Sequence, residues 1–281
     1  MKKLILTSFI CSNILFCFSQ NFPKKQILIP LSNTNGVPFY KDQELNDFVV
    51  DGFEIDNKGN FYFMGGEKTE SLAIFSGDKQ VFRKTYNKDC PDCLLYIYKD
   101  TLYTFNRQNN DLILFNKSNG LLIKKYTHII SKRINSYKFT DNTLVIELLG
   151  DSKLTYEQYT LLGKYVKQVP NDCGITQFVI PKRDRNYDLS FLGKWDANYV
   201  FWALVDENDS QIQKFLLVNK DGKVLATKSL VNKNNVFGRV YAENPDEHRK
   251  VRNGNLYVLG HSREGNFALI TEVPLQSFFY K

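Results

Sequence analysis

The chain has 281 residues, of which 24% are charged and 43% are hydrophobic. This balance is ordinary for a globular protein and excludes a chain that is disordered throughout. The formal net charge is +7, but the basic residues form no run of the kind that binds nucleic acid, so we expect no nucleic-acid partner.

The N-terminus predicts a secretory signal peptide over residues 1–19. A short basic stretch precedes an apolar run over 4–18. Cys17 and Ser19 place small side chains at the −3 and −1 positions of a cleavage site. An uncleaved membrane anchor is the alternative, although the apolar run is short for a bilayer span. We therefore expect residues 20–281 to form one exported domain, periplasmic, cell-surface or extracellular, with no membrane span in the mature chain.

Five similar units follow, each opening with a turn rich in Asp, Asn or Gly and a short aromatic or β-branched strand. Such turns close β-hairpins, because Asn, Asp and Gly tolerate the left-handed backbone of a tight turn. A second hairpin follows in each of the first four units. The five turn-and-strand segments are 56–63, 99–105, 141–146, 196–202 and 252–258. A unit of two hairpins has four strands, which is the content of one blade of a β-propeller.

The spacing of the units favours a propeller over a β-sandwich, the main alternative. Equivalent points in the five units are Asn60, Thr101, Thr143, Tyr199 and Asn255. They are 41, 42, 56 and 56 residues apart, and a propeller blade takes roughly 40–50 residues. A sandwich would not by itself explain paired hairpins at near-regular spacing. We therefore predict an all-β propeller of about five four-stranded blades, with a sixth, degenerate blade in 31–50 or 171–187 as the alternative.

The two ends of the chain are expected to close the ring together. The last unit has three strands, the third near Asn266 to Val273, and only a weak fourth. Lys25 to Leu31 is a strand-like run with no partner of its own. Because an open ring would leave strand edges exposed, we predict that this N-terminal run completes the last blade as its outer strand. Pro30 fits an edge strand, which has no need of an amide hydrogen on its open side.

The Asp-x-x-Gly-Asn-aromatic pattern of 56–62, with its echo at 252–257, resembles the turn-plus-strand signature of NHL-like and related six-bladed propellers. The resemblance covers most of 50–273 as architecture, and three of the five units lack the Gly. That family includes binding modules and enzymes. The resemblance therefore implies a fold and not an activity.

Three cysteines remain after the signal peptide: Cys90, Cys93 and Cys173. In an oxidising compartment we predict at most one disulfide, between Cys90 and Cys93, and the alternative is a bond from either of them to Cys173. The chain has no second C-x-x-C and no clustered His, so we predict no metal site and no cofactor.

Arginine and lysine are distributed differently over the predicted blades. Loops between blades, and loops between second and third strands, share one face, and most Arg residues lie in or beside them. Lys residues crowd the opposite turns and the outer strands. The guanidinium fork suits carboxylate or sulfate groups. His261 follows a strand beside Arg263 and joins this face, whereas His248 is expected on a solvated surface. The predicted ligand-binding residues are Arg107, Arg133, Arg183, Arg185, His261 and Arg263.

The sequence contains no nucleophile elbow, phosphate loop, zinc signature or EF-hand loop. We therefore predict a non-enzymatic binding or interaction module, whose partner is a protein or an anionic glycan or carboxylate ligand. The alternative is a hydrolase or lyase that acts on a carbohydrate or lactone from the central channel. A channel lined by carboxylates would favour that enzyme, since its catalytic acids would come one per blade.

Overall fold

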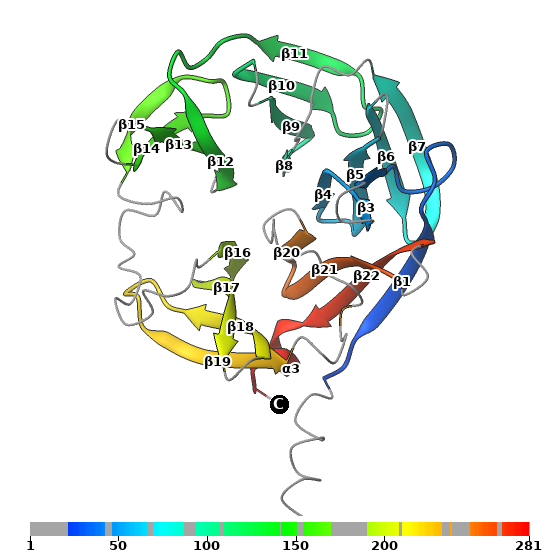
Figure 1. Cartoon of the computed structure of the whole chain (residues 1–281), viewed down its shortest axis with the longest axis vertical. Helices are drawn as coiled ribbons and strands as arrows, with labels where there is room; N and C mark the ends of the chain where they lie inside the picture. The colour runs from blue at the N-terminus through cyan, green and yellow to red at the C-terminus, as the bar shows by residue number, and fades with distance from the viewer. Residues whose placement is uncertain are drawn as a thin grey trace, which may run out of the picture.

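Five four-stranded antiparallel blades form a ring in the computed structural model of the protein (Figure 1). The structure describes residues 22–42, 47–66, 70–86, 94–106, 109–140, 142–150, 154–169, 190–207, 210–231, 237, 248–262 and 266–280. The fold is therefore a five-bladed β-propeller, which confirms the predicted fold class. The predicted signal peptide and the cysteines Cys90, Cys93 and Cys173 lie outside the described residues.

In the first four blades the strands follow one another in chain order, from the innermost to the outermost (Figure 1). Blade 1 contains β4 (Gly52–Ile55), β5 (Asn60–Gly65), β6 (Glu70–Ser76) and β7 (Lys79–Tyr86). Blade 2 contains β8 (Leu95–Tyr98), β9 (Thr101–Asn106), β10 (Asp111–Asn116) and β11 (Leu122–Tyr126). Blade 3 contains β12 (Ile134–Thr140), β13 (Thr143–Leu149), β14 (Leu154–Thr160) and β15 (Tyr165–Val169). Blade 4 contains β16 (Ser190–Trp195), β17 (Asn198–Glu207), β18 (Ser210–Val218) and β19 (Val224–Val231).

Blade 5 is built from both ends of the chain, which confirms the predicted closure. Its three C-terminal strands are β20 (Arg249–Arg252), β21 (Asn255–His261) and β22 (Phe267–Pro274). Its outer strand is β1 (Lys25–Pro30), which lies beside β22 (Figure 1). The two strands pair antiparallel, with Ile29 opposite Ala268. Strands from the two ends of the chain therefore share one sheet, which holds the ring closed.

The segment 31–50, one of the two places considered for a sixth blade, contains a small hairpin instead, and the other, 171–187, lies outside the described residues. Its strands are β2 (Tyr40–Asp42) and β3 (Asp47–Val49), which pair only with each other. Within the described residues, no helix is long and apolar enough to cross a membrane.

The tight turns have the backbone geometry that their sequences predicted. Lys99, Asn142, Asp196 and Asn253 all lie in the left-handed region, with φ between 50° and 64°. Gly120, in the outer turn of blade 2, has a φ of +59° and sits against blade 1, where an added Cβ would lie 2.5 Å from the Phe82 ring. Only glycine meets both conditions, so this turn can fit closely against the neighbouring blade.

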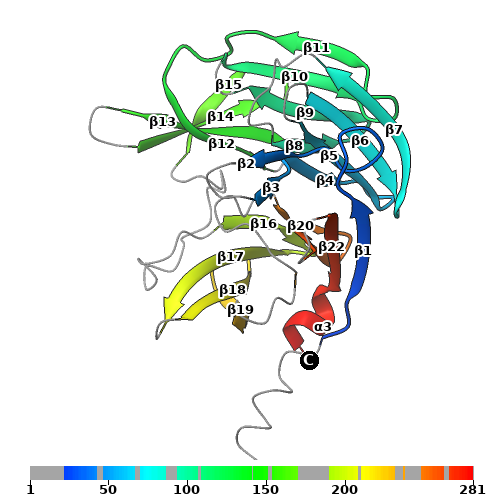
Figure 2. The same ribbon diagram turned by 45° about the vertical axis from the view of Figure 1, so that its right-hand side comes forward.

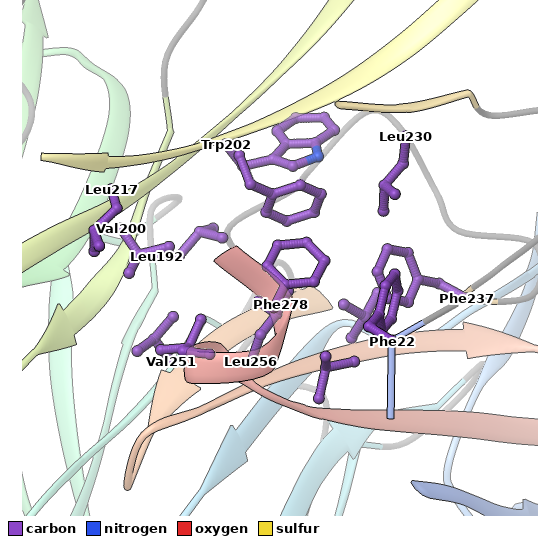
Figure 3. Packing of buried hydrophobic residues seen from close by; sticks show 14 residues of the cluster. Phe22, Leu192, Val200, Trp202, Leu217, Leu230, Phe237, Val251, Leu256 and Phe278 are labelled. Atoms are coloured by element: carbon purple, nitrogen blue, oxygen red, sulfur yellow. The ribbon is translucent and has the colours of Figure 1, made fainter. Parts of the chain in front are cut away.

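Aromatic packing secures the joint between blades 4 and 5 (Figure 3). The C-terminal helix α3 (Leu275–Tyr280) follows β22 and lies beside the start of β1 (Figure 2). Its Phe278 ring meets the Phe22 ring edge-on at 5.0 Å and the Phe215 ring at 5.1 Å. Such edge-to-face pairs stabilise a joint beyond the area that they bury. The helix therefore helps to hold both chain ends in the closed ring.

Candidate functional site

A cavity of about 390 Å³ lies between the innermost strands of the ring, and we call it the inner cavity. Residues of all five innermost strands, β4, β8, β12, β16 and β20, line it. It is therefore the central channel of the propeller. Its volume falls within the range of about 300–1,000 Å³ that is typical of small-ligand sites.

The inner cavity lies towards the end of the ring that carries the tight turns between first and second strands, which we call the turn face. Asn57, Asn142 and Asn253 of these turns line it. A second cavity of about 260 Å³, the outer cavity, shares Asn57, Tyr96, Asn142 and Arg252 with it. The two cavities therefore adjoin one another at the turn face.

Positive charge dominates the inner cavity. Five cationic side chains and one carboxylate belong to the part of its lining that the structure describes. They are Lys138, Lys194, Arg249, Lys250, Arg252 and Glu54. Like charges gathered in a concave site raise the local potential and attract a ligand of opposite charge.

The carboxylate of Glu54 is held inside the protein by two contacts. Glu54 is 3% exposed, and its Oε1 accepts a hydrogen bond of 2.9 Å from the backbone amide of Ile55. The same oxygen is 3.4 Å from Nη2 of Arg252. This ion pair joins β4 of blade 1 to β20 of blade 5. Glu54 is therefore paired with Arg252, and the other four cations of the described lining are Lys138, Lys194, Arg249 and Lys250.

Two of these cations are buried against aromatic rings. Lys138 is 9% exposed, and its Nζ lies 5.9 Å from the centre of the Phe191 ring. Arg249 is 1% exposed, and its guanidinium lies 4.0 Å from the centre of the Trp202 ring. Its Nη2 donates to Oε1 of Gln213 over 3.4 Å. Cation–π contacts of this kind strengthen when they are removed from water, so both charges are held in fixed positions.

The outer cavity includes a carboxylate that organises a turn. Asp56 is 2% exposed and accepts hydrogen bonds from the backbone amides of Lys58 and Asn60 and from the hydroxyl of Tyr62. Burial alone would raise the pKa of Asp56, but the hydrogen bonds from Asn60 and Lys58 outweigh it and hold the pKa below its usual 3.8. Lys117 adds an ionic contact at 3.8 Å. Asp56 is therefore charged at neutral pH, and it stabilises the turn.

The outer cavity is also lined by Tyr96, Tyr98 and Lys99, which we call the aromatic wall. The Tyr96 ring is stacked on Phe139 at 5.3 Å, and its hydroxyl donates to Oδ1 and accepts from the backbone amide of Asn142. The Nζ of Lys99 lies 5.3 Å from the centre of the Tyr98 ring. These contacts give the wall fixed aromatic surfaces next to a cation.

The predicted site residues fall mostly outside the described part of the chain. Those outside it are Arg107, Arg183, Arg185 and Arg263. Arg133 is exposed and immediately precedes β12. His261 ends β21, is 4% exposed and has its Nδ1 2.8 Å from the carbonyl oxygen of Ser262. Both lie at the blade ends away from the tight turns, and a rim of Arg residues there stays a prediction.

The cationic lining of the inner cavity was not predicted from the sequence, and one histidine was predicted in the wrong environment. The prediction that His248 lies on a solvated surface is wrong: it is 2% exposed, and its Nε2 is 3.1 Å from the carbonyl oxygen of Val50. The reason is that residues 249–252 form the innermost strand of blade 5 rather than a surface turn. A signal was available, since three of these four residues are basic and the segment directly precedes the turn of a predicted hairpin.

Comparison with known protein families gives no match, and no curated protein matches the sequence. The resemblance to NHL-like propellers therefore stays a prediction.

Solved structures with a similar arrangement include three from different organisms. BamB from Moraxella catarrhalis is 8% identical over 90% of this chain and 100% of that chain, with a TM-score of 0.35. The WD40 domain of coronin from Toxoplasma gondii is 9% identical over 92% of this chain and 62% of that chain, with a TM-score of 0.35. Apo AztD from Citrobacter koseri is 9% identical over 93% of this chain and 82% of that chain, with a TM-score of 0.39. Likenesses of this degree say nothing about function.

Proposed function

We propose that the protein is a non-enzymatic binding module that takes an anionic group into its inner cavity from the turn face. The observation that carries this proposal is the positive charge of the lining of the inner cavity. The inner cavity is lined by lysines from three different blades, namely Lys138, Lys194 and Lys250. Glu54, the carboxylate among the described lining residues, is paired with Arg252. An anion entering this cavity gains attraction from several cations at once.

The cations of the cavity suit a carboxylate or sulfate group. Lysine acts as a compact point charge with three donors, which can follow an oxyanion in several orientations. Attraction in a partly enclosed cavity exceeds that on an open surface, because the effective dielectric constant is lower. Arg249 is already engaged with Trp202 and Gln213, so we assign it to holding the site rather than to contacting the ligand.

We further propose that the site works outside the cytoplasm. The N-terminal basic stretch and apolar run support this, and mass spectrometry of exported protein should find a mature N-terminus at or near Gln20. Retention of Met1 in that protein would contradict export. The predicted rim of Arg residues is expected at the blade ends away from the turn face and would be a separate anionic contact.

The test is a calorimetric titration with free uronic acids at low and at moderate salt. The double variant Lys194→Ala, Lys250→Ala should bind on the order of tenfold more weakly than the parent at low salt, a difference of about 1.4 kcal/mol. The difference should shrink as salt rises. The control is Lys167→Ala, which removes a charge from the exposed face of β15 and should leave affinity within about twofold of the parent.

Equal binding by the double variant and the Lys167→Ala control would refute a site in the channel. Failure of every anion to bind the parent would refute it as well. Cleavage of an added acidic oligosaccharide during the titration would identify the alternative hydrolase or lyase.

A further inference from the structure

We infer that the ligand is an acidic oligosaccharide, with one charged sugar ring in the inner cavity and the next ring across the outer cavity. The inference rests on the proposed function of the inner cavity and adds the class and length of the ligand. Three features of the lining carry it: the two adjoining cavities, the repeated positive charge, and the aromatic wall with its neighbouring amide side chains.

The geometry suits a ligand longer than one small anion. The cavities of about 390 and 260 Å³ share four lining residues, among them Tyr96 and Arg252. Each has its own lysines. Lys194 and Lys250 line the inner cavity, and Lys99 and Lys117 line the outer one. Lys117 is paired with Asp56, so we assign the ligand contact in the outer cavity to Lys99. A chain with an anionic group on each successive unit would meet a cation in both cavities.

The exposed chemistry of the lining matches sugar hydroxyl groups. Apart from the half-buried Leu94, its aliphatic members are nearly buried and offer a ligand little surface. Leu95 is 2% exposed, and Ile97, Leu192 and Val251 are each 7% exposed. The exposed side chains include Asn57 and Asn142 in the turns. An amide side chain both donates and accepts hydrogen bonds, as a sugar hydroxyl does.

The aromatic wall supplies the remaining contact. Stacking on Phe139 and the two hydrogen bonds to Asn142 fix the ring of Tyr96. A fixed ring loses little further rotamer freedom when a ligand packs against it. The apolar C–H face of a sugar ring can lie on such a surface, while its equatorial hydroxyl groups reach the neighbouring amides and hydroxyl.

The experiment compares chain lengths. The probes are galacturonate, glucuronate and mannuronate, each as the monomer and as the linear trimer, together with a tri-glutamate peptide. We expect the trimer of at least one uronate to bind on the order of tenfold more tightly than its monomer. We expect Lys99→Asn to weaken trimer binding and leave monomer binding unchanged. Asn is the matched replacement, because Lys99 has a φ of 53° that Asn tolerates. The double variant Lys194→Ala, Lys250→Ala should weaken both probes.

The outcomes separate the two proposals. If monomers bind and respond to the double variant but no trimer binds more tightly, the elongated ligand is refuted and the anion site stands. If Lys99→Asn changes both probes equally or neither, the role of the outer cavity is refuted. If tri-glutamate binds as tightly as the best trimer, the ligand is an acidic peptide and the sugar assignment is refuted. If no monomer responds to the double variant, the proposed function itself fails.

Discussion

Replacing Ile29 by alanine tests how far the N-terminal strand stabilises the closed ring. Ile29 is 0% exposed and belongs to a cluster with Phe53, Phe63 and Ile270 at the joint between blades 5 and 1. Truncating a buried isoleucine to alanine costs about 2–5 kcal/mol. We expect a loss of about 3 kcal/mol, because the site is fully buried between two sheets and has little room to collapse.

The neighbouring residue provides the control. Leu28 is 52% exposed on the same strand, so Leu28→Ala should lower the free energy of unfolding by less than about 0.5 kcal/mol. Urea unfolding, followed by the fluorescence of Trp195 and Trp202, measures both variants. With a slope of about 3 kcal/mol per molar, Ile29→Ala should move the midpoint down by about 1 M. Equal midpoints for the two variants would refute the claim that β1 is an integral part of blade 5.

Three further predictions concern turns and sulfur. Gly120→Ala should destabilise the protein by about 1–3 kcal/mol in thermal unfolding, because its φ of +59° and the nearby Phe82 ring both disfavour a Cβ; an unchanged melting temperature would contradict this. The folded-state pKa of Asp56 is below the usual 3.8, so its stabilising effect is complete above that pH and is lost as pH falls through the depressed value. Asp56→Asn should therefore lower the free energy of unfolding more at pH 6 than at pH 2.5. An equal loss at both pH values would contradict a charged Asp56 that stabilises the turn. Peptide mapping of the oxidised protein should find Cys90 bonded to Cys93, and a bond to Cys173 would overturn that pairing.

The fold was predictable because its signals are local. Each tight turn needs a residue that tolerates a left-handed backbone, and Asn142 and Asn253 are such residues where the turns were expected. The incomplete last unit and the strand-like Lys25 to Leu31 together indicated the closure that β1 makes with β22. Only the exact number of blades stayed open, since the inserts disturbed the spacing. The segment 31–50 turned out to hold a two-stranded hairpin.

The cavity was not predictable in the same way, because its residues are far apart in the sequence. Glu54 and Arg252 are separated by 198 positions and meet only when the ring closes. Charges in an innermost strand look in sequence like the charges of an exposed turn, which is how His248 was misplaced. The sorting of Arg and Lys by position favoured the face with the long loops, and it gave no weight to lysines in the innermost strands, such as Lys138 in β12.

The affinity of the Glu54→Gln variant for a uronic acid tests the anion-binding account most directly. Glutamine keeps the shape of Glu54 and an oxygen that can accept from the amide of Ile55, but it removes the carboxylate from the described lining of the inner cavity. A unit charge about 8 Å from the ligand, at an effective dielectric constant of about 40, contributes about 1 kcal/mol. The account predicts that the variant binds on the order of fivefold more tightly than the parent, most clearly at low salt. Weaker or unchanged binding by a variant with the parent's melting temperature would contradict it.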